Sequence, residues 1–341
     1  MARATRMNSI TSPELLTQVN QKNTDLLKDF VEYLQSTQKS DGTIKGYKND
    51  IQIAFVWSLL YNDNAFFCDW NKRQLIKFQN WLLNDNGNSP ARVRRIRGSL
   101  SSMGNYVESV LDDEFPKYRN IINKIEAPVN QQVRTKTILT DEDVRLMLDT
   151  LLQKKKYEMA CYVALAAFGG RRKSEICRFK VTDFADSRLV CGGSLWKSDP
   201  IKTKGRGRGK YLHCYTLVSK FRPFLERWLR ERIINGIESE WLFPKHNNPS
   251  EHIDITTVNS WMTTLSKLTG ADIYAHSFRH YYTTMLSNQG LPDSVIKEVQ
   301  GWADIGMVSV YVDRSTEETL EMYFDSDGIK TQKQKSLSDL E

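Results

Sequence analysis

Apolar side chains recur every three or four residues through the first third of the chain, which is the spacing of one helix face. A first helix is predicted from Thr24, a residue type that caps helix starts, to Leu34. Three further apolar stripes follow, at Ile44, Tyr47, Ile51, Phe55 and Leu59, then Leu75, Ile76, Phe78, Trp81 and Leu82, then Val93, Ile96, Leu100 and Met103. The last of these helices opens at Ser89 and Pro90, where proline is favoured because the first helical N–H needs no partner. These apolar stripes therefore predict that this part of the chain forms a helical domain.

A second domain is predicted after a polar stretch with one proline and no periodicity, residues 126–137. Thr140 and Asp143 form the pattern of a capping box and start a new amphipathic helix. A glycine-rich, strand-prone segment is expected over 189–215, and further helices over 159–168, 217–233, 255–268, 276–287 and 292–299. The predicted fold class is mainly α with a small antiparallel β-sheet in the second domain.

The predicted organisation has five segments. They are a loose N-terminal arm (1–20), a helical domain (21–125), a linker (126–137), a mixed α/β domain (138–326) and a polar C-terminal tail (327–341).

Composition narrows the function classes only slightly. The chain carries 48 Lys and Arg against 41 Asp and Glu, a net charge of +7, which points weakly to polyanionic partners, nucleic acid first. Its five cysteines show no CxxC and no histidine at metal-ligand spacing, so neither a zinc site nor a disulfide framework is predicted. No apolar run approaches the roughly 20 residues of a membrane span, and no signal sequence is evident. We expect a cytoplasmic, DNA-associated protein with no membrane partner.

The predicted helix after Ser89 crowds four arginines into its first two turns, at Arg92, Arg94, Arg95 and Arg97. The usual interpretation of such a charge run is a solvated face. The alternative is an exposed helix that contacts phosphates or a groove of DNA.

Two segments of the second domain place cations beside glycines. In FGGRRKSEI, a glutamate follows Arg172 by three residues, at Glu175, and is placed to orient its guanidinium. An exposed arginine pair at a helix start is an equally good interpretation of this motif alone. In IKTKGRGRGKYLHCY, a basic hairpin presents Lys202 or Lys204 to a substrate. Its other basic residues, expected to contact DNA, are Arg206, Arg208 and Lys210.

Two further segments carry donors and a nucleophile. AHSFRHYYTTML places His276 and Arg279 on one helix face, where a donor and a permanent cation can grip one oxyanion. His280 follows directly and is either a helix-packing histidine or a support for the site. In GWADIGMVSVY, Tyr311 lies nine residues after Trp302. Taken alone, each of these aromatic residues is also typical of a protein core.

Together these segments resemble the tyrosine recombinase, or phage integrase, family over nearly the whole chain. FGGRRKSEI is similar to its G-x-R-x-S-E box, with Arg172 as the first catalytic arginine and Arg171 where an apolar residue is usual. HSFRH resembles the H-x-x-R-H box, with His276 and Arg279. GWADIGMVSVY resembles the last box, with Trp302 and the nucleophile Tyr311. The basic hairpin lies where the family keeps its catalytic lysine; the spacing to His213 favours Lys204 and the Lys-Thr pairing favours Lys202.

The resemblance implies a core-binding, SAM-like helical domain and a catalytic domain that form a C-shaped clamp on DNA. It implies cleavage through a 3'-phosphotyrosine and a four-way (Holliday) junction, without metal, ATP or another cofactor. Glu175 and His280 are expected to support the site. The implied partners are double-stranded DNA with short inverted core sites, a homotetramer formed on DNA from free monomers, and an accessory directionality factor in some systems. The C-terminal tail is expected to pack on a neighbouring subunit.

Other functions share some of these residues. A type IB topoisomerase uses the same attack but rejoins the same strand, and a DNA-binding protein that has lost catalysis would keep only the basic helix. A metal nuclease fits least, because no Asp, Glu and His cluster is evident. By residue type alone, Tyr281, Tyr282 and Tyr323 compete with Tyr311 as nucleophile, and only the spacing from Trp302 favours Tyr311.

Overall fold

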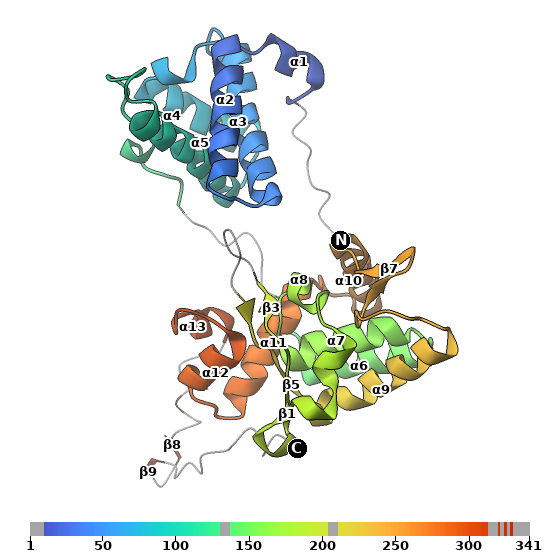
Figure 1. Cartoon of the computed structure of the whole chain (residues 1–341). Coiled ribbons are helices and arrows are strands. Elements are labelled where there is room, and N and C mark those ends of the chain that lie inside the picture. Colours follow the sequence, from blue (N-terminus) through green and yellow to red (C-terminus); the bar gives the residue numbers. More distant parts are fainter. Residues whose placement is uncertain are drawn as a thin grey trace. The chain divides into compact units, whose positions relative to one another are not determined.

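The computed structural model describes residues 10–129, 137–203, 211–312, 320, 324–325 and 328–329. They form two compact units, one of residues 10–129 and one of the described residues from 137 onward. Each unit has its own apolar core (Figure 1). Within these ranges, no helix has both the length and the apolar character needed to cross a bilayer.

All regular elements of the first unit, within residues 10–129, are helices or helical turns. Its elements are α1 (Pro13–Gln18), α2 (Gln21–Ser36), α3 (Asp41–Tyr61), the 3₁₀ turn η1 (Phe67–Asp69), α4 (Lys72–Asn80), the π-helical turn η2 (Trp81–Asp85), α5 (Pro90–Val110) and the 3₁₀ turn η3 (Ile122–Lys124). The predicted start of α5 is confirmed: the hydroxyl of Ser89 accepts the N–H of Arg92, and Pro90 is the first helical residue.

The N-terminal boundary differs from the prediction. Residues 1–20 were expected to form a loose arm, but Pro13–Gln18 is helical and Val19 is buried. Helix α2 begins before Thr24, because the Asn20 side chain already caps the preceding turn. An apolar pattern spread over only six residues is too short to reveal α1 by periodicity.

Helices α3 and α5 lie side by side in the core of the first unit, and α2 packs along α3 (Figure 1). The predicted inward face of α5 is confirmed, since its four apolar residues are fully buried: Val93, Ile96, Leu100 and Met103. Aromatic rings fill the space towards α4, with Trp57 5.1 Å from Phe78 and 5.4 Å from Trp70 between ring centroids. Burial of rings of this size is a major source of stability for a helical unit.

The second unit combines helices with short antiparallel strands, as the predicted fold class requires (Figure 1). Its helices are α6 (Asp141–Gln153), α7 (Tyr157–Gly169), α8 (Lys173–Ile176), α9 (Val218–Ile234), α10 (Ile255–Thr269), α11 (Ala275–Asn288), α12 (Asp293–Gln300) and α13 (Met307–Tyr311), with 3₁₀ turns η4 (Val181–Phe184), η5 (Asp186–Arg188) and η6 (Cys191–Gly193). Its strands are β1 (Leu189–Val190), β2 (Leu195–Lys197), β3 (Ile201–Lys202), β4 (Tyr211–Leu212), β5 (Tyr215–Leu217), β6 (Pro244–Lys245), β7 (Asn248–His252), β8 (Phe324–Asp325) and β9 (Gly328–Ile329).

The strands pair in the order β1-β2-β5, with Trp196 of β2 opposite Leu189 and Thr216. Strands β3 and β4 form the predicted basic hairpin. The Thr140–Asp143 capping box is also confirmed, with both of its bonds present. The β6–β7 hairpin was not predicted, because the sequence of β7 shows no alternation of apolar residues.

Helix α7 is the centre of the second unit. It is apolar on all sides, is buried along its length and contacts α6, α9 and α11. It ends at Gly170, which has φ +60°, and a Cβ added there would lie 2.2 Å from Cδ1 of Tyr282 in α11. Only glycine fits this turn without displacing α11. The turn therefore places Arg171 and Arg172 beside α11.

Candidate active site

Arg172 is held at the start of α8 by a carboxylate. Its NH1 atom donates to Oε1 of Glu175 at 2.8 Å, and its backbone N–H donates to Oε2 at 3.1 Å. The Glu175 side chain is 2% exposed, whereas that of Arg172 is 36% exposed. The buried carboxylate thus fixes a guanidinium that solvent, and therefore a ligand, can reach.

Arg279 lies in the first turns of α11 and is fully buried. It donates from NH1 to the carbonyl of Gly170 at 2.9 Å and from NH2 to the carbonyl of Gln300 at 3.1 Å. Burial, reinforced by the charges of Arg172 and Arg171, lowers the pKa of Arg279 to about 10. The side chain stays charged at neutral pH, and its Nε has no hydrogen-bond partner among the described residues. Positive charge is therefore concentrated where α7, α11 and α12 meet.

His276 and Tyr311 are in direct contact. Nε2 of His276 and the phenolic oxygen of Tyr311 are joined by a hydrogen bond of 2.5 Å. Burial, with the charge of Arg279 acting in the same direction, lowers the pKa of His276 to about 4. The imidazole is therefore neutral at pH 7, with one ring nitrogen carrying the proton. Tyr311 is 6% exposed at the end of α13.

Two more aromatic residues enclose Tyr311. The ring of Trp302 lies 4.8 Å from that of Tyr311, and the guanidinium carbon of Arg279 lies 5.1 Å from the Trp302 ring. Nε1 of Trp302 is buried and has no hydrogen-bond partner within the described part of the chain. His280, 8% exposed, lies with its ring 4.4 Å from that of Tyr311. A buried donor without a partner is uncommon in a folded protein and suggests that a ligand supplies the acceptor.

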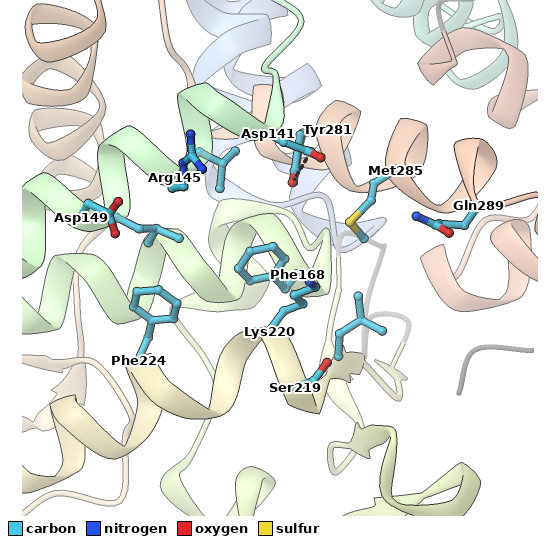
Figure 2. A pocket seen from close by; sticks show the side chains of 13 residues that line it. Asp141, Arg145, Asp149, Phe168, Ser219, Lys220, Phe224, Tyr281, Met285 and Gln289 are labelled. Carbon is cyan, nitrogen blue, oxygen red and sulfur yellow. Dashed lines mark hydrogen bonds between the residues drawn. The ribbon is translucent and has the colours of Figure 1, made fainter. Parts of the chain in front are cut away.

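The described rival tyrosines have other environments. Tyr281 lies at a separate pocket of about 410 Å³. Its hydroxyl donates to Oδ1 of Asp141 at 2.8 Å, and this pair can be followed in Figure 2. Tyr282 is fully buried against Gly170. Burial raises the pKa of both phenols. Tyr323 lies outside the described residues.

Residues 137–318 match the family model described as the phage integrase family. The chain belongs to the phage integrase family. It is 26% identical over 290 residues to the SPbeta prophage-derived recombinase-like protein YomM of Bacillus subtilis (strain 168), with 84% of each chain covered. It is 23% identical over 298 residues to a tyrosine recombinase of Thermosipho africanus (strain TCF52B), covering 84% of this chain and 94% of that one.

The fold is similar to that of a lambda integrase whose crystal structure is a dimer bound to a COC' core site. The TM-score is 0.64 at 15% identity, with 94% of this chain and 85% of that chain covered. The family predicted from the order of the three sequence boxes and the basic hairpin is confirmed, and the protein is a tyrosine-type site-specific DNA recombinase.

The catalytic lysine was predicted at Lys202 or Lys204. Lys202 is exposed at the end of β3, and its carbonyl accepts a hydrogen bond from NH1 of Arg178 at 2.9 Å. Lys204 lies outside the described residues, as do the predicted DNA contacts Arg206, Arg208 and Lys210.

One of the four arginines of α5 is buried, contrary to the prediction. Arg97 was predicted to be exposed for DNA, but it is 6% exposed and donates to the carbonyls of Ile122 and Ile125 at 2.8 and 2.6 Å. Its guanidinium is occupied in holding the segment after α5, so it is not available to a phosphate. Arg94 is exposed, and its NH1 donates to the carbonyl of Pro128 at 2.8 Å.

Arg92 and Arg95 of the same helix are anchored by Asp50, whose side chain is 1% exposed. NH1 of Arg92 lies 2.5 Å from Oδ1 and Nε of Arg95 lies 3.3 Å from Oδ2. The side chains are 29% and 61% exposed, so both retain surface that can contact DNA.

Sequence reasoning missed the carbonyl groups that organise the site, those of Gly170, Val299 and Gln300. The last carbonyls of any helix lack partners within the helix, so the C-terminus of α12 was a usable signal. What the sequence did not indicate is which arginines would reach these carbonyls, because that depends on how α7, α11 and α12 pack.

Proposed function

We propose that Tyr311 is the nucleophile with which this recombinase cuts DNA, forming a 3'-phosphotyrosine. The observation that carries the proposal is the 2.5 Å hydrogen bond between Tyr311 and His276 within a cluster that also holds Arg279 and Trp302. A phenol attacks a phosphodiester poorly unless the phosphate charge is neutralised and the phenolic proton has an acceptor.

Neutralisation falls to Arg172 and Arg279. Arg172 offers the solvent-exposed part of its guanidinium. The buried Arg279 donates NH1 and NH2 to carbonyls, so it contributes its charge and the Nε–H that has no partner among the described residues. The free Nε1–H of Trp302 adds a hydrogen bond to a non-bridging oxygen, and Glu175 keeps Arg172 in place. A phosphate bound among these residues brings negative charge next to His276 and so raises the pKa that burial had lowered.

Proton transfer follows from that change. As the Tyr311 oxygen bonds to phosphorus, its proton passes to Nε2 of His276, which His280 supports through ring contact. The bond to the 5'-oxygen breaks, and Lys204 or Lys202 supplies the proton to that oxygen. The phosphotyrosine conserves the bond energy, so the reaction requires neither ATP nor a metal ion.

Attack by the 5'-hydroxyl of a second duplex reverses the step and exchanges strands. Two such exchanges pass through a four-way junction in a homotetramer assembled from monomers on short inverted core sites. The exposed surfaces of Arg92, Arg94 and Arg95 and the basic hairpin contact the DNA backbone. An accessory factor that sets direction is compatible with this scheme but is not required for cleavage.

A covalent-capture experiment tests the proposal. The protein is mixed with DNA from the ends of its native element in the presence of EDTA, denatured and digested, and the peptides are searched by mass spectrometry for a nucleotide on Tyr311. Tyr311→Phe is the matched control, since it keeps the ring and removes only the hydroxyl. We expect an adduct on Tyr311 that is lost in the variant.

The proposal fails if bound DNA yields no adduct, or if the adduct lies on another tyrosine such as Tyr323. Relaxation of supercoiled DNA without exchange between duplexes would replace recombination by a topoisomerase activity.

A further inference from the structure

Arg171 is a buried cation to which the proposed chemistry gives no task. Its side chain is 1% exposed, and none of the described carboxylates forms an ion pair with it. NH1 donates to the carbonyl of Gln300 at 3.3 Å, and NH2 donates to the carbonyl of Val299. These are the last two carbonyls of α12, which have no partner within the helix.

The carbonyl of Gln300 is shared. It also accepts from NH2 of Arg279 at 3.1 Å, while NH1 of Arg279 donates to the carbonyl of Gly170 at 2.9 Å. Arg171 directly follows Gly170, so the end of α7, Arg279 and the end of α12 are joined in one closed set of hydrogen bonds. The position of α12 relative to Arg279 is thereby fixed from two sides.

The position of Trp302 depends on that of the α12 end. It lies two residues after Gln300, and Gly301 between them has φ +66° and no room for a side chain, since an added Cβ would meet Cδ1 of Leu212 at 2.6 Å. The short, closely packed connection transmits any displacement of the α12 end to the indole. The indole in turn contacts both Arg279 and Tyr311.

We propose that Arg171 is a positioning residue for DNA cleavage, which acts by holding Trp302 against Arg279 and Tyr311. The inference rests on the proposed role of Tyr311 as nucleophile. A leucine at this position would leave the carbonyl of Val299 without the Arg171 donor and the carbonyl of Gln300 with Arg279 alone. The end of α12 would then shift towards other donors.

The test is a double-mutant cycle on single-turnover formation of the protein–DNA adduct. Arg171→Leu, Trp302→Ala and the double variant are compared with the wild type, and DNA affinity is measured separately. We expect Arg171→Leu to slow adduct formation on the order of 10²-fold, with DNA affinity unchanged. In the Trp302→Ala background, the same substitution is expected to slow the reaction by less than about threefold, because its route of action is already absent.

Arg232→Leu is the matched control. Arg232 is also a buried arginine of the second unit, 5% exposed, and donates to the carbonyls of Ser239, Trp241 and Leu242. It makes no described contact with Tyr311 or Trp302, so its loss should lower the melting temperature and leave the cleavage rate of folded protein unchanged.

Arg171→Lys keeps the inference testable if the leucine variant does not fold. Lysine retains the charge but lacks the planar fork, and we expect it to slow cleavage by at least tenfold. Full activity of Arg171→Lys would show that the charge of Arg171 is sufficient, and equal slowing by Arg171→Leu with and without Trp302 would show that Arg171 does not act through Trp302. Either result overturns the inference. Unchanged cleavage by Arg171→Leu beside an active wild type overturns this inference alone. A wild type that forms no adduct overturns the proposed function and the inference with it.

Discussion

The phenolic oxygen of Tyr311 lies 2.5 Å from Nε2 of His276, although the two residues are 35 positions apart in the chain. Helix α11 presents the imidazole and α13 presents the phenol, and each helix packs against the other. Through this hydrogen bond, the imidazole of His276 can accept the phenolic proton of Tyr311. The contact also buries the imidazole beside Arg279, and both the burial and the charge of Arg279 lower the pKa of His276.

Stability of the recombinase should depend on pH through His276. The unfolded chain takes up this proton near the ordinary pKa of 6.5, whereas the folded protein does so only at about 4. Between these values the unfolded state binds more protons, so the free energy of unfolding falls as the pH drops from 6.5 towards 4 and is unaffected above 6.5. The melting temperature of the wild type should therefore fall more than that of His276→Gln on going from about pH 7 to about pH 5. Parallel decreases in the two proteins would contradict this account.

Trp302→Phe should separate stacking from hydrogen bonding. Phenylalanine keeps a ring near Tyr311 but removes an Nε1–H that has no partner among the described residues. We expect cleavage to slow by roughly tenfold or more and the melting temperature to remain unchanged. In the control, Trp228→Phe, the lost Nε1–H donates to the carbonyl of Leu242 at 2.8 Å. That variant should lose about 1 kcal/mol of stability and keep its rate, and the reverse pattern would exclude a donor role for Trp302.

Gly170→Ala should be much more harmful than Gly270→Ala. Both glycines have positive φ, +60° and +73°, but an added Cβ at Gly170 would lie 2.2 Å from Tyr282, whereas none of the described atoms lies within 4 Å of one at Gly270. Backbone strain alone should cost about 1 kcal/mol at Gly270, and the clash should bring the cost at Gly170 to about 3 kcal/mol or more. Chemical denaturation of both variants measures the difference. Equal losses of stability would mean that α11 moves away from the added methyl group at no cost in free energy.

Asp50→Ala should destabilise the first unit by about 1–3 kcal/mol, because it removes the buried carboxylate that accepts from Arg92, Arg95 and the hydroxyl of Ser99. Asp25→Ala is the control, since its ion pair with Lys28 is exposed and should contribute less than about 0.5 kcal/mol. Hydrogen exchange of the amides in α3 and α5 reports the change within this unit. Protection that is equal in both variants would show that Asp50 is dispensable.

The family, the fold class and most helices were predictable from the amino-acid sequence. Local patterns carry this information: the apolar stripe of α5 with its Ser89 cap, the Thr140–Asp143 capping box, and the order of the motifs around Arg172, Arg279 and Tyr311. Each pattern depends on residues within a few turns of one another, where spacing translates directly into a shared face or a cap.

The roles of the buried arginines were not predictable in this way, because they depend on how distant elements pack. The sequence pattern predicts Arg97 to be one more exposed cation of its helix, yet the side chain is buried and donates to two backbone carbonyls. Arg171 reads as the neighbour of Arg172, yet its guanidinium reaches Gln300, 129 positions away. A guanidinium finds its acceptors at the ends of a long side chain and in elements brought together by packing. Such partners have no fixed spacing along the chain, which is why the sequence left them open.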